Sequence, residues 1–305
     1  MRDPGDPHLR DLRYFVAVAD ELSFTRAAQR LHVSQPALSK QVRALEARLG
    51  AELFTRGHRS IALTAAGIAL LPRAREIVQG WERAGAEVRA VLGTAGRTIT
   101  VGFHTRIGRG LVPAITAALA ERLPGWRLRF HQVEWGDPSV GLRDGSADVA
   151  VAWLPVPGPG IAHRVAATED RWVALPVGHR LAAREVVTFA ELAGEPFVAL
   201  PASAGPMREF WLATAQRSVP ARIGAEAVTA DEAFEAVASG LGVVLLAAGN
   251  AAIYRRDDVV ARPVADLPRC ELAVLWREDD RRPAVRVVTD ACCRCVADDA
   301  PTPPG

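Results

Sequence analysis

The first fifty residues alternate apolar and polar positions with the period of amphipathic helices. In the first predicted helix the apolar positions are three or four residues apart; they are Leu12, Phe15, Val16 and Ala19. A second, shorter helix is predicted around 27–31, and residues 32–34 form a tight turn. A third helix begins after Ser34, which can cap it, and ends at Gly50. Its apolar stripe consists of Leu38, Val42, Leu45 and Leu49. Two short helices around a three-residue turn predict a helix-turn-helix.

The segment that follows predicts a hairpin and a long helix. Gly57 lies between two short β-compatible stretches within 53–63, a pattern typical of a wing. Thr64 can cap a helix that continues to about Leu92. Apolar and small residues recur along it in heptads; they are Leu71, Ala74, Val78, Trp81, Gly85, Val88 and Leu92. This seam favours pairing with a second copy of the helix. The alternative is a long helix packed on its own domain.

Beyond a short hinge at 93–97, strands alternate with helices. The predicted strands are 99–103, 127–133, 148–153, 172–176, 197–200, 243–247 and 271–276. The predicted helices are 110–123, a short one before Gly145, 207–216, 231–239 and 283–295. Such alternation predicts a largely parallel sheet covered by helices. The length of this region and a break near 160–170 favour two α/β lobes.

Charge is distributed unevenly along the chain. The 305 residues carry a net charge of +2. Residues 1–97 hold 15 basic and 10 acidic side chains, about +5, whereas the remainder holds 22 and 25, about −3. Contact with a polyanion is therefore expected in the N-terminal third. No signal segment or membrane-length apolar run is present, so we expect a cytoplasmic protein.

The polar face of the third helix carries the candidate chemistry. Gln35, Ser39, Lys40 and Arg43 lie away from the apolar stripe. Gln and Arg can read base edges with paired hydrogen bonds, and Ser and Lys can hold phosphates. A small helical bundle with a solvated polar face is the alternative, and the pattern alone does not decide between them.

The residues themselves resemble a known family. The stretches that carry the resemblance are Ser-Phe-Thr-Arg-Ala-Ala at 23–28, Val-Ser-Gln-Pro-Ala-Leu-Ser at 33–39, Leu-Glu at 45–46, Leu-Gly at 49–50, Leu-Phe-Thr-Arg at 53–56 and Leu-Thr-Ala-Ala-Gly at 63–67. Together they look like the signature of LysR-type transcriptional regulators. The remainder agrees in order and length with that family's linker helix and periplasmic-binding-protein-like effector domain.

The resemblance implies a fold, partners and a DNA-binding set of residues. The fold is α/β with an N-terminal all-α winged helix-turn-helix at 1–64, a dimerising linker helix at 65–93 and an effector domain at 97–305. Its first lobe is 97–165 plus 270–297, and its second is 166–269. The implied partners are a double-stranded dyad operator, a small effector bound between the lobes, and further copies as a dimer or dimer of dimers; RNA polymerase is left open. The residues expected to face DNA are Gln35, Pro36, Ser39, Lys40, Arg43 and, in the wing, Arg56.

Effector contacts are expected at the start of the first effector-domain helix and in a facing loop of the second lobe. Thr105 is the main candidate in the first, although the spacing fits Arg106 slightly better. Ser203 is the polar donor of the facing loop. Ordinary turn capping is an equal alternative for Thr105 and Ser203. Arg106 suggests an acidic effector, although a solvated surface arginine is the commoner case. The expected effector is an organic acid or an aromatic compound.

Enzymatic and metal chemistry find no support in the sequence. It contains no phosphate-binding loop, nucleophile elbow, HExxH motif or dinucleotide fingerprint. No cofactor is therefore expected. Cys292, Cys293 and Cys295 lack a second pair of metal ligands, so ordinary helical cysteines are favoured over a zinc site or redox switch.

Overall fold

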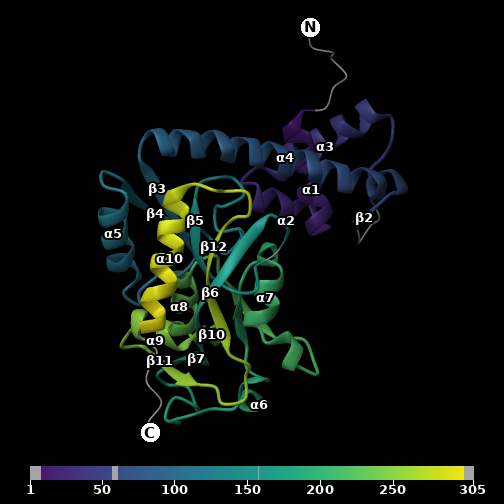
Figure 1. The fold of residues 1–305 in the computed structure, drawn as a ribbon. Helices are drawn as coiled ribbons and strands as arrows, with labels where there is room; N and C mark the ends of the chain where they lie inside the picture. Colours follow the sequence, from purple (N-terminus) through teal and green to yellow (C-terminus); the bar gives the residue numbers. More distant parts are fainter. Residues whose placement is uncertain (1–7, 57–60, 157, 299–305) are drawn as a thin grey trace. The chain divides into compact units, whose positions relative to one another are not determined.

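The computed structural model describes residues 8–56, 61–156 and 158–298 (Figure 1). It divides into two compact units, Met1–Gly85 and Ala86–Gly305. Each unit has its own apolar core, and each is described by itself below.

The N-terminal unit contains the three predicted helices. Ser23 accepts a hydrogen bond from the Arg26 N–H and caps the second, and Ser34 accepts from the Ala37 N–H and caps the third. Gly50 ends the third with a left-handed φ of 65°. The predicted helix-turn-helix is thus confirmed as a fold. The elements are α1 (Leu9–Glu21), α2 (Phe24–Arg30), α3 (Gln35–Leu49), β1 (Phe54–Arg56), β2 (Ile61–Leu63) and α4 (Ala65–Ala95).

The core of this unit packs behind α3. Leu38, Val42 and Leu45 are fully buried, as the helical period predicts, whereas Leu49, the last predicted position of the stripe, is exposed at the end of the helix. Phe54 brings the start of the hairpin into the same core, with its ring centroid 5.5 Å from that of Phe15. Because both the helices and the hairpin depend on this core, the orientation of α3 is set by packing.

The hairpin β1–β2 is antiparallel, with Arg56 opposite Ile61. Residues 57–60 lie outside the described residues, and the predicted turn at Gly57 lies with them. Thr64 accepts a hydrogen bond from the Gly67 N–H at 3.1 Å, so the predicted cap of α4 is confirmed.

The predicted heptad seam of helix α4 is covered in its first half and exposed in its second. Leu71, Ala74 and Val78 pack into the core of the N-terminal unit, as the alternative interpretation expects for that half. Further along, Trp81 and Val88 are exposed. The exposed apolar side chains that share this later face are Ile77, Trp81, Val88, Val91 and Leu92.

The C-terminal unit is built around two main sheets. The larger sheet has the order β4-β3-β5-β12-β6, and α10 packs against α5 and β6 on it. The smaller sheet has the order β10-β7-β11, and β8 pairs with β9 separately. The strands are β3 (Thr98–Phe103), β4 (Arg127–Gln132), β5 (Val149–Trp153), β6 (Ile161–Glu169), β7 (Arg171–Pro176), β8 (Phe197–Ala199), β9 (Ile223–Glu226), β10 (Val244–Ala247), β11 (Val259–Pro263) and β12 (Cys270–Arg277). The helices are α5 (Leu111–Arg122), α6 (Phe189–Leu192), α7 (Pro206–Trp211), α8 (Ala230–Ala238), α9 (Ala248–Ile253) and α10 (Pro283–Asp298), with 3₁₀ turns η1 (Ala202–Ala204) and η2 (Thr214–Gln216).

The chain passes between the two main sheets twice, once from β6 to β7 and once from β11 to β12. The sheets therefore define two lobes, and β6 contains the predicted lobe boundary at 165/166. The expectation of a largely parallel sheet is wrong: β12 runs antiparallel to both β5 and β6, and β7 is antiparallel to both its neighbours.

Three further sequence expectations fail for local reasons. Strands β6, β9 and β11 were not predicted, because edge strands carry partly exposed side chains and no apolar run. The short helix before Gly145 is a series of turns, because Val140 and Gly141 have positive φ. The helix predicted at 207–216 breaks where Ala213 adopts a φ of 51°.

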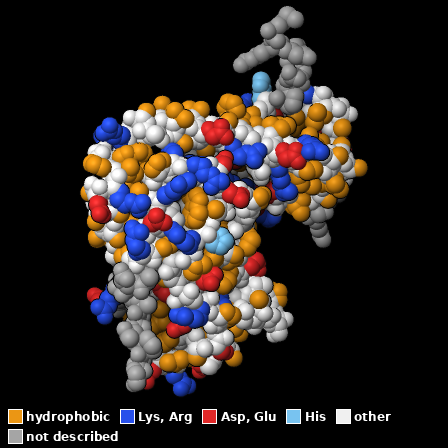
Figure 2. Space-filling view, viewed as in Figure 1, with side chains coloured by type: hydrophobic (Ala, Val, Ile, Leu, Met, Phe, Trp, Pro, Cys, Tyr) orange, Lys and Arg blue, Asp and Glu red, His pale blue; other side chains and the backbone are white. Residues whose placement is uncertain are grey.

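The surface on the face drawn in Figure 2 mixes basic and acidic side chains with apolar ones. Across the described residues, no helix is both long and apolar enough to span a bilayer.

Candidate functional site

Helix α3 presents the polar residues that the sequence singled out. Gln35, Pro36, Lys40 and Arg43 are exposed, and Ser39 is half-buried. The Gln35 Nε2 group donates a hydrogen bond to Ser39 Oγ at 2.9 Å. This bond fixes the Gln35 amide against its own helix and uses one of its two amide hydrogens.

Behind α3, Glu46 holds the start of the hairpin. Its carboxylate Oε1 accepts from the Leu53 N–H at 3.0 Å and from the Phe54 N–H at 3.3 Å. This role of Glu46 could not be predicted from the sequence, since an acidic residue in a helix gives no sign of burial. Arg56 lies two residues further on, in β1. The hairpin is thereby tied to the helix that carries Gln35.

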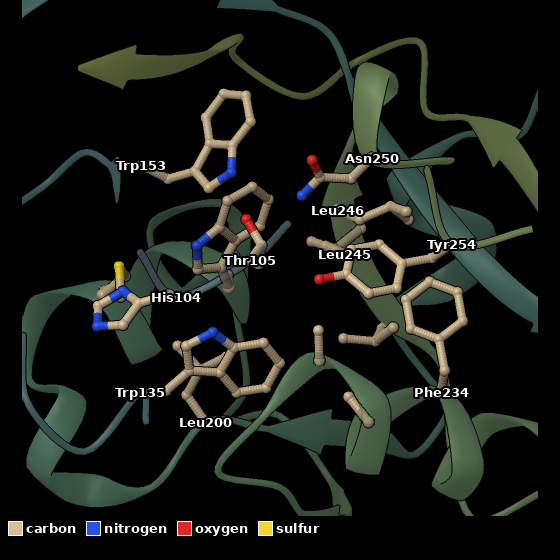
Figure 3. Close-up of a pocket in the computed structure, with 15 residues that line it drawn as sticks. His104, Thr105, Trp135, Trp153, Leu200, Phe234, Leu245, Leu246, Asn250 and Tyr254 are labelled. Atoms are coloured by element: carbon tan, nitrogen blue, oxygen red, sulfur yellow. The ribbon is translucent and has the colours of Figure 1, made fainter. Parts of the chain in front are cut away.

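In the C-terminal unit, a cavity of about 50 Å³, partly open to solvent, lies between the two lobes (Figure 3). From the first lobe, the residues that line it follow or end β3, β4 and β5; they are His104, Thr105, Trp135 and Trp153. From the second lobe they are Leu200, Met207, Trp211, Ala230, Ala233, Phe234, Val244, Leu245, Leu246, Asn250 and Tyr254.

The three predicted effector residues lie at different depths. Thr105 lines the cavity, whereas Arg106 and Ser203 do not belong to its lining. The Arg106 side chain is 60% exposed and forms an ion pair with Asp231 at 3.6 Å. Ser203 lies near Gly136, next to the lining residue Trp135. Of the two residues weighed for the first loop, Thr105 is therefore the one that faces the cavity.

Polar contacts join the two lobes around the cavity. The Arg106 backbone N–H donates to the Tyr254 hydroxyl at 2.8 Å. The Trp135 backbone N–H donates to the Val228 carbonyl at 2.9 Å. Arg109 forms a double hydrogen bond with Glu169 and also donates to the Asn250 amide oxygen at 3.1 Å. A change in what the cavity holds would therefore act directly on contacts between the lobes.

Most of the polar lining could not be predicted from the sequence. Trp153, Asn250 and Tyr254 stand on different elements and approach one another only through tertiary folding. No motif or spacing links them. His104 is buried, and its Nε2 contacts the Asp137 carbonyl at 2.9 Å. Burial lowers the pKa of His104, so its ring is neutral at neutral pH.

Comparison with known proteins now decides the family. The model described as "Bacterial regulatory helix-turn-helix protein, lysR family" matches residues 9–68, and "LysR substrate binding domain" matches residues 93–294. The chain belongs to the LysR family. It is a DNA-binding transcriptional regulator with an effector-binding domain, like other LysR proteins, which are regulators rather than enzymes.

Individual relatives extend over nearly the whole chain. It is 35% identical over 283 residues to the "Hca operon transcriptional activator HcaR" of Escherichia coli (strain K12), covering 91% of this chain and 94% of that protein. It is 36% identical over 246 residues to the "HTH-type transcriptional regulator ShiR" of Corynebacterium glutamicum (strain R), covering 79% and 83%. The solved structure of full-length CbnR with its target DNA is 26% identical, with a TM-score of 0.51 and coverage of 95% and 99%.

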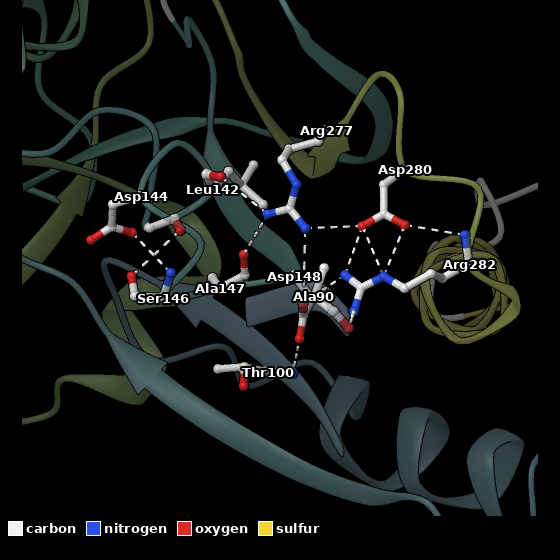
Figure 4. Close-up of polar contacts among 11 residues, drawn as sticks. Ala90, Thr100, Leu142, Asp144, Ser146, Ala147, Asp148, Arg277, Asp280 and Arg282 are labelled. Carbon is white, nitrogen blue, oxygen red and sulfur yellow. Dashed lines mark hydrogen bonds and ion pairs between the residues drawn. The ribbon is translucent and has the colours of Figure 1, made fainter. Parts of the chain in front are cut away.

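In this LysR protein a buried ionic cluster fixes the C-terminal part of α4 (Figure 4). Arg282 donates to the Ala90 carbonyl at the end of α4 and also binds Asp148 at 2.6 Å and Asp280 at 2.7 Å. Arg277 contacts Asp280 at 3.0 Å. Burial by itself raises the pKa of Asp280, but the hydrogen bonds and charges of Arg282 and Arg277 outweigh it and hold the pKa below its usual value.

Acid should therefore weaken this cluster. A carboxyl whose folded pKa is depressed adds stability above its unfolded pKa of about 4, and that stability is lost as the pH falls through the folded value. We expect Asp280→Asn to show a smaller loss of unfolding free energy between pH 6 and pH 3 than the parent in urea titrations. Asp279→Asn, at an exposed neighbour outside the cluster, should keep the parent's pH dependence. Identical pH dependence in all three proteins would contradict this assignment.

Two of the four cysteines, Cys270 and Cys292, are buried free thiols. Burial raises the pKa of Cys270 and of Cys292 to about 12, so both thiols are protonated and poorly reactive at neutral pH. Among the residues that the structure describes, no group of three or more His, Cys, Asp or Glu side chains is placed to hold a metal ion.

Proposed function

We propose that this LysR regulator senses a small aromatic compound or organic acid in the cavity between its two lobes and thereby controls transcription from a dyad operator. The observation that carries the proposal is that cavity: both lobes line it, and its walls are mainly aromatic and aliphatic. Because the same contacts join the lobes and surround the cavity, an occupant would change the balance between open and closed arrangements.

For operator binding, we propose that Gln35 and Ser39 meet base edges and that Pro36 lies against the groove at the start of α3. Lys40 and Arg43 reach bases or phosphates, and Arg56 contacts the backbone. The exposure of the α3 residues supports these roles, since a helix in the major groove presents its N-terminal part most deeply.

For assembly, we propose a homodimer formed through α4, with a dimer of dimers as the larger form and RNA polymerase as a further partner. The functional segments follow as 1–64, 65–93 and 97–305, the last with lobes at 97–165 plus 270–297 and at 166–269. Because the target is chromosomal DNA, we place the protein's action in the cytoplasm. The exposed apolar face of α4 supports pairing.

A gel shift on the DNA upstream of the protein's own gene tests the function directly. A thermal-shift screen with aromatic and short-chain carboxylates first supplies effector candidates. The full chain should retard this DNA and not a scrambled fragment of equal length, and an effector should alter the shift. Failure to distinguish the two fragments would refute operator recognition.

Within the cavity, Thr105 is the proposed contact, while Arg106 and Ser203 would contact only an effector that extends beyond the lining. We expect Thr105→Ala to weaken binding of the tightest screened compound about fivefold, because one hydrogen bond contributes about 1 kcal/mol. Ser203→Ala should weaken it less. Operator affinity without effector should remain that of the parent in both variants. Calorimetric titration measures the affinity for the compound. An unchanged affinity in Thr105→Ala would show that the effector does not depend on the Thr105 hydroxyl.

A further inference from the structure

The indole of Trp153 presents a buried donor to the effector cavity. Trp153 is only 4% exposed, and its Nε1 group has no hydrogen-bond partner among the residues that the structure describes. Figure 3 shows this nitrogen turned toward the space between Trp153, Thr105 and Asn250. A buried N–H without an acceptor costs about 1–3 kcal/mol, so it is rarely retained without a role.

The Trp153 ring is held firmly in this orientation. The Arg109 guanidinium lies 5.2 Å from the indole centre on one side, and Trp211 packs against it edge-on at 6.2 Å. Arg109 is in turn fixed by its double hydrogen bond with Glu169. Rotation of the indole to satisfy its N–H elsewhere would disrupt both contacts. The donor is therefore positioned in advance for an incoming group.

The polar side chains near this donor also offer hydrogens. The Asn250 amide oxygen accepts from Arg109, which leaves its NH₂ group for the cavity, as Figure 3 shows. The Tyr254 hydroxyl accepts from the Arg106 N–H at 2.8 Å and can still donate its own hydrogen. Three neutral donors thus surround one part of the cavity, and their natural partner is an oxygen that accepts.

The remaining wall suits a flat apolar body. Trp135, Trp211 and Phe234 supply aromatic surface, and Met207 and the leucines fill the gaps between them. No Lys, Arg, Asp or Glu belongs to the described lining. The guanidinium beside Trp153, that of Arg109, is already paired with Glu169, and the guanidinium over Tyr254, that of Arg106, is paired with Asp231. Recognition in this cavity therefore depends on aromatic contact and on neutral polar groups, among them the unpartnered Nδ1 of His104.

We propose that the effector is an aromatic compound whose acyl oxygen accepts a hydrogen bond from Trp153 Nε1, with Asn250 and Tyr254 as the adjoining donors. The aromatic ring lies against Trp135 and Phe234. This assignment rests on the proposed function of the cavity and names the chemistry that it selects. An acyl oxygen is shared by carboxylates and by uncharged amides and ketones.

Calorimetry on the full chain tests the assignment with three probes that share one ring: benzamide, benzoate and toluene. Trp153→Phe keeps an aromatic ring but removes the N–H. Of benzamide and benzoate, the probe that binds the parent more tightly should bind this variant about tenfold more weakly, as expected for loss of a hydrogen bond in a dry site. The affinity for toluene should change by less than twofold. Tighter binding of benzamide assigns the oxygen to a neutral carbonyl, and tighter binding of benzoate assigns it to a carboxylate.

Phe234→Leu is the matched control, since it removes aromatic wall and no donor. It should weaken all three probes by similar factors. If Trp153→Phe changed the acyl probes and toluene equally, or if only toluene bound, the acyl contact would be refuted while sensing by the cavity would stand. If none of the probes bound at millimolar concentration, the single-ring acyl class would be wrong. Such a result would not bear on operator binding, which the gel shift tests independently.

Discussion

Replacement of Trp81 by glutamate is expected to convert a dimer of this LysR regulator into monomers. Trp81 is 63% exposed on α4, an extent unusual for so large an apolar side chain. Ile77, Val88 and Leu92 are exposed on the same face of the helix, at steps that return to it after whole turns. A second copy of α4 is the occupant that this stripe fits best, because a helix with a matching stripe buries both at once.

The expected effect is large because the side chain counts twice in a symmetric pair. A tryptophan buries about 150–250 Å² at an interface. At about 25 cal/mol per Å², the 63% of this area that is still exposed corresponds to about 2–4 kcal/mol for each copy. A carboxylate in its place loses this term and must also be desolvated. The dimer dissociation constant should rise at least a thousandfold, as measured by sedimentation equilibrium on the full chain.

Gln79→Glu provides the control. Gln79 is exposed on α4, about 200° round the helix from Trp81. The Gln79→Glu substitution therefore adds the same negative charge on the opposite face of the helix. This variant should remain a dimer with the parent's dissociation constant. An unchanged dimer in Trp81→Glu, or equal dissociation in both variants, would exclude this face as the interface.

The heptad seam of α4 also illustrates how far the sequence could be interpreted. The heptad pattern correctly located a long helix and its cap at Thr64. It could not show that Leu71, Ala74 and Val78 belong to the core of their own unit. A helical period identifies which positions are apolar, whereas the surface that covers them depends on elements distant in sequence.

The effector cavity was less accessible to prediction than the helix-turn-helix. The cap at Ser34 and the burial of Leu38 follow from local spacing, so a single segment suffices to predict them. Trp153 and Asn250 are almost a hundred positions apart on different elements, and only the crossings between the two sheets bring them together. Even Thr105 could be placed only to within one residue, because its segment is an irregular loop before α5.

The second large effect concerns Gln35. We expect Gln35→Ala to weaken binding to the true operator by about 1–3 kcal/mol, while binding to random DNA changes little. Gln35 is the first residue of α3, where a recognition helix enters the groove most deeply. Its hydrogen bond to Ser39 at 2.9 Å uses one amide hydrogen. The remaining N–H and the Oε1 atom match the acceptor and donor that adenine presents in the major groove.

Two variants separate base reading from phosphate anchoring. Arg56→Ala should weaken operator and random DNA about equally and lower the salt dependence by about one ion, since a phosphate contact carries no sequence information. Gln41→Ala is the control for a glutamine-to-alanine change elsewhere on α3. Gln41 lies on α3 about 120° round from Gln35 and is half-buried, so its loss should leave the ratio of specific to random binding unchanged.

The hydrogen bond within α3 gives a further internal check on Gln35. Ser39→Ala removes the anchor of the amide, so Gln35 must be ordered on binding. The loss in operator affinity should therefore be smaller than for Gln35→Ala, and it should nearly disappear when Gln35 is already alanine. Fluorescence anisotropy on operator and random duplexes at several salt concentrations measures all of these quantities. If Gln35→Ala weakened both duplexes alike, Gln35 would be a general DNA contact, and sequence reading would have to depend on Lys40 and Arg43.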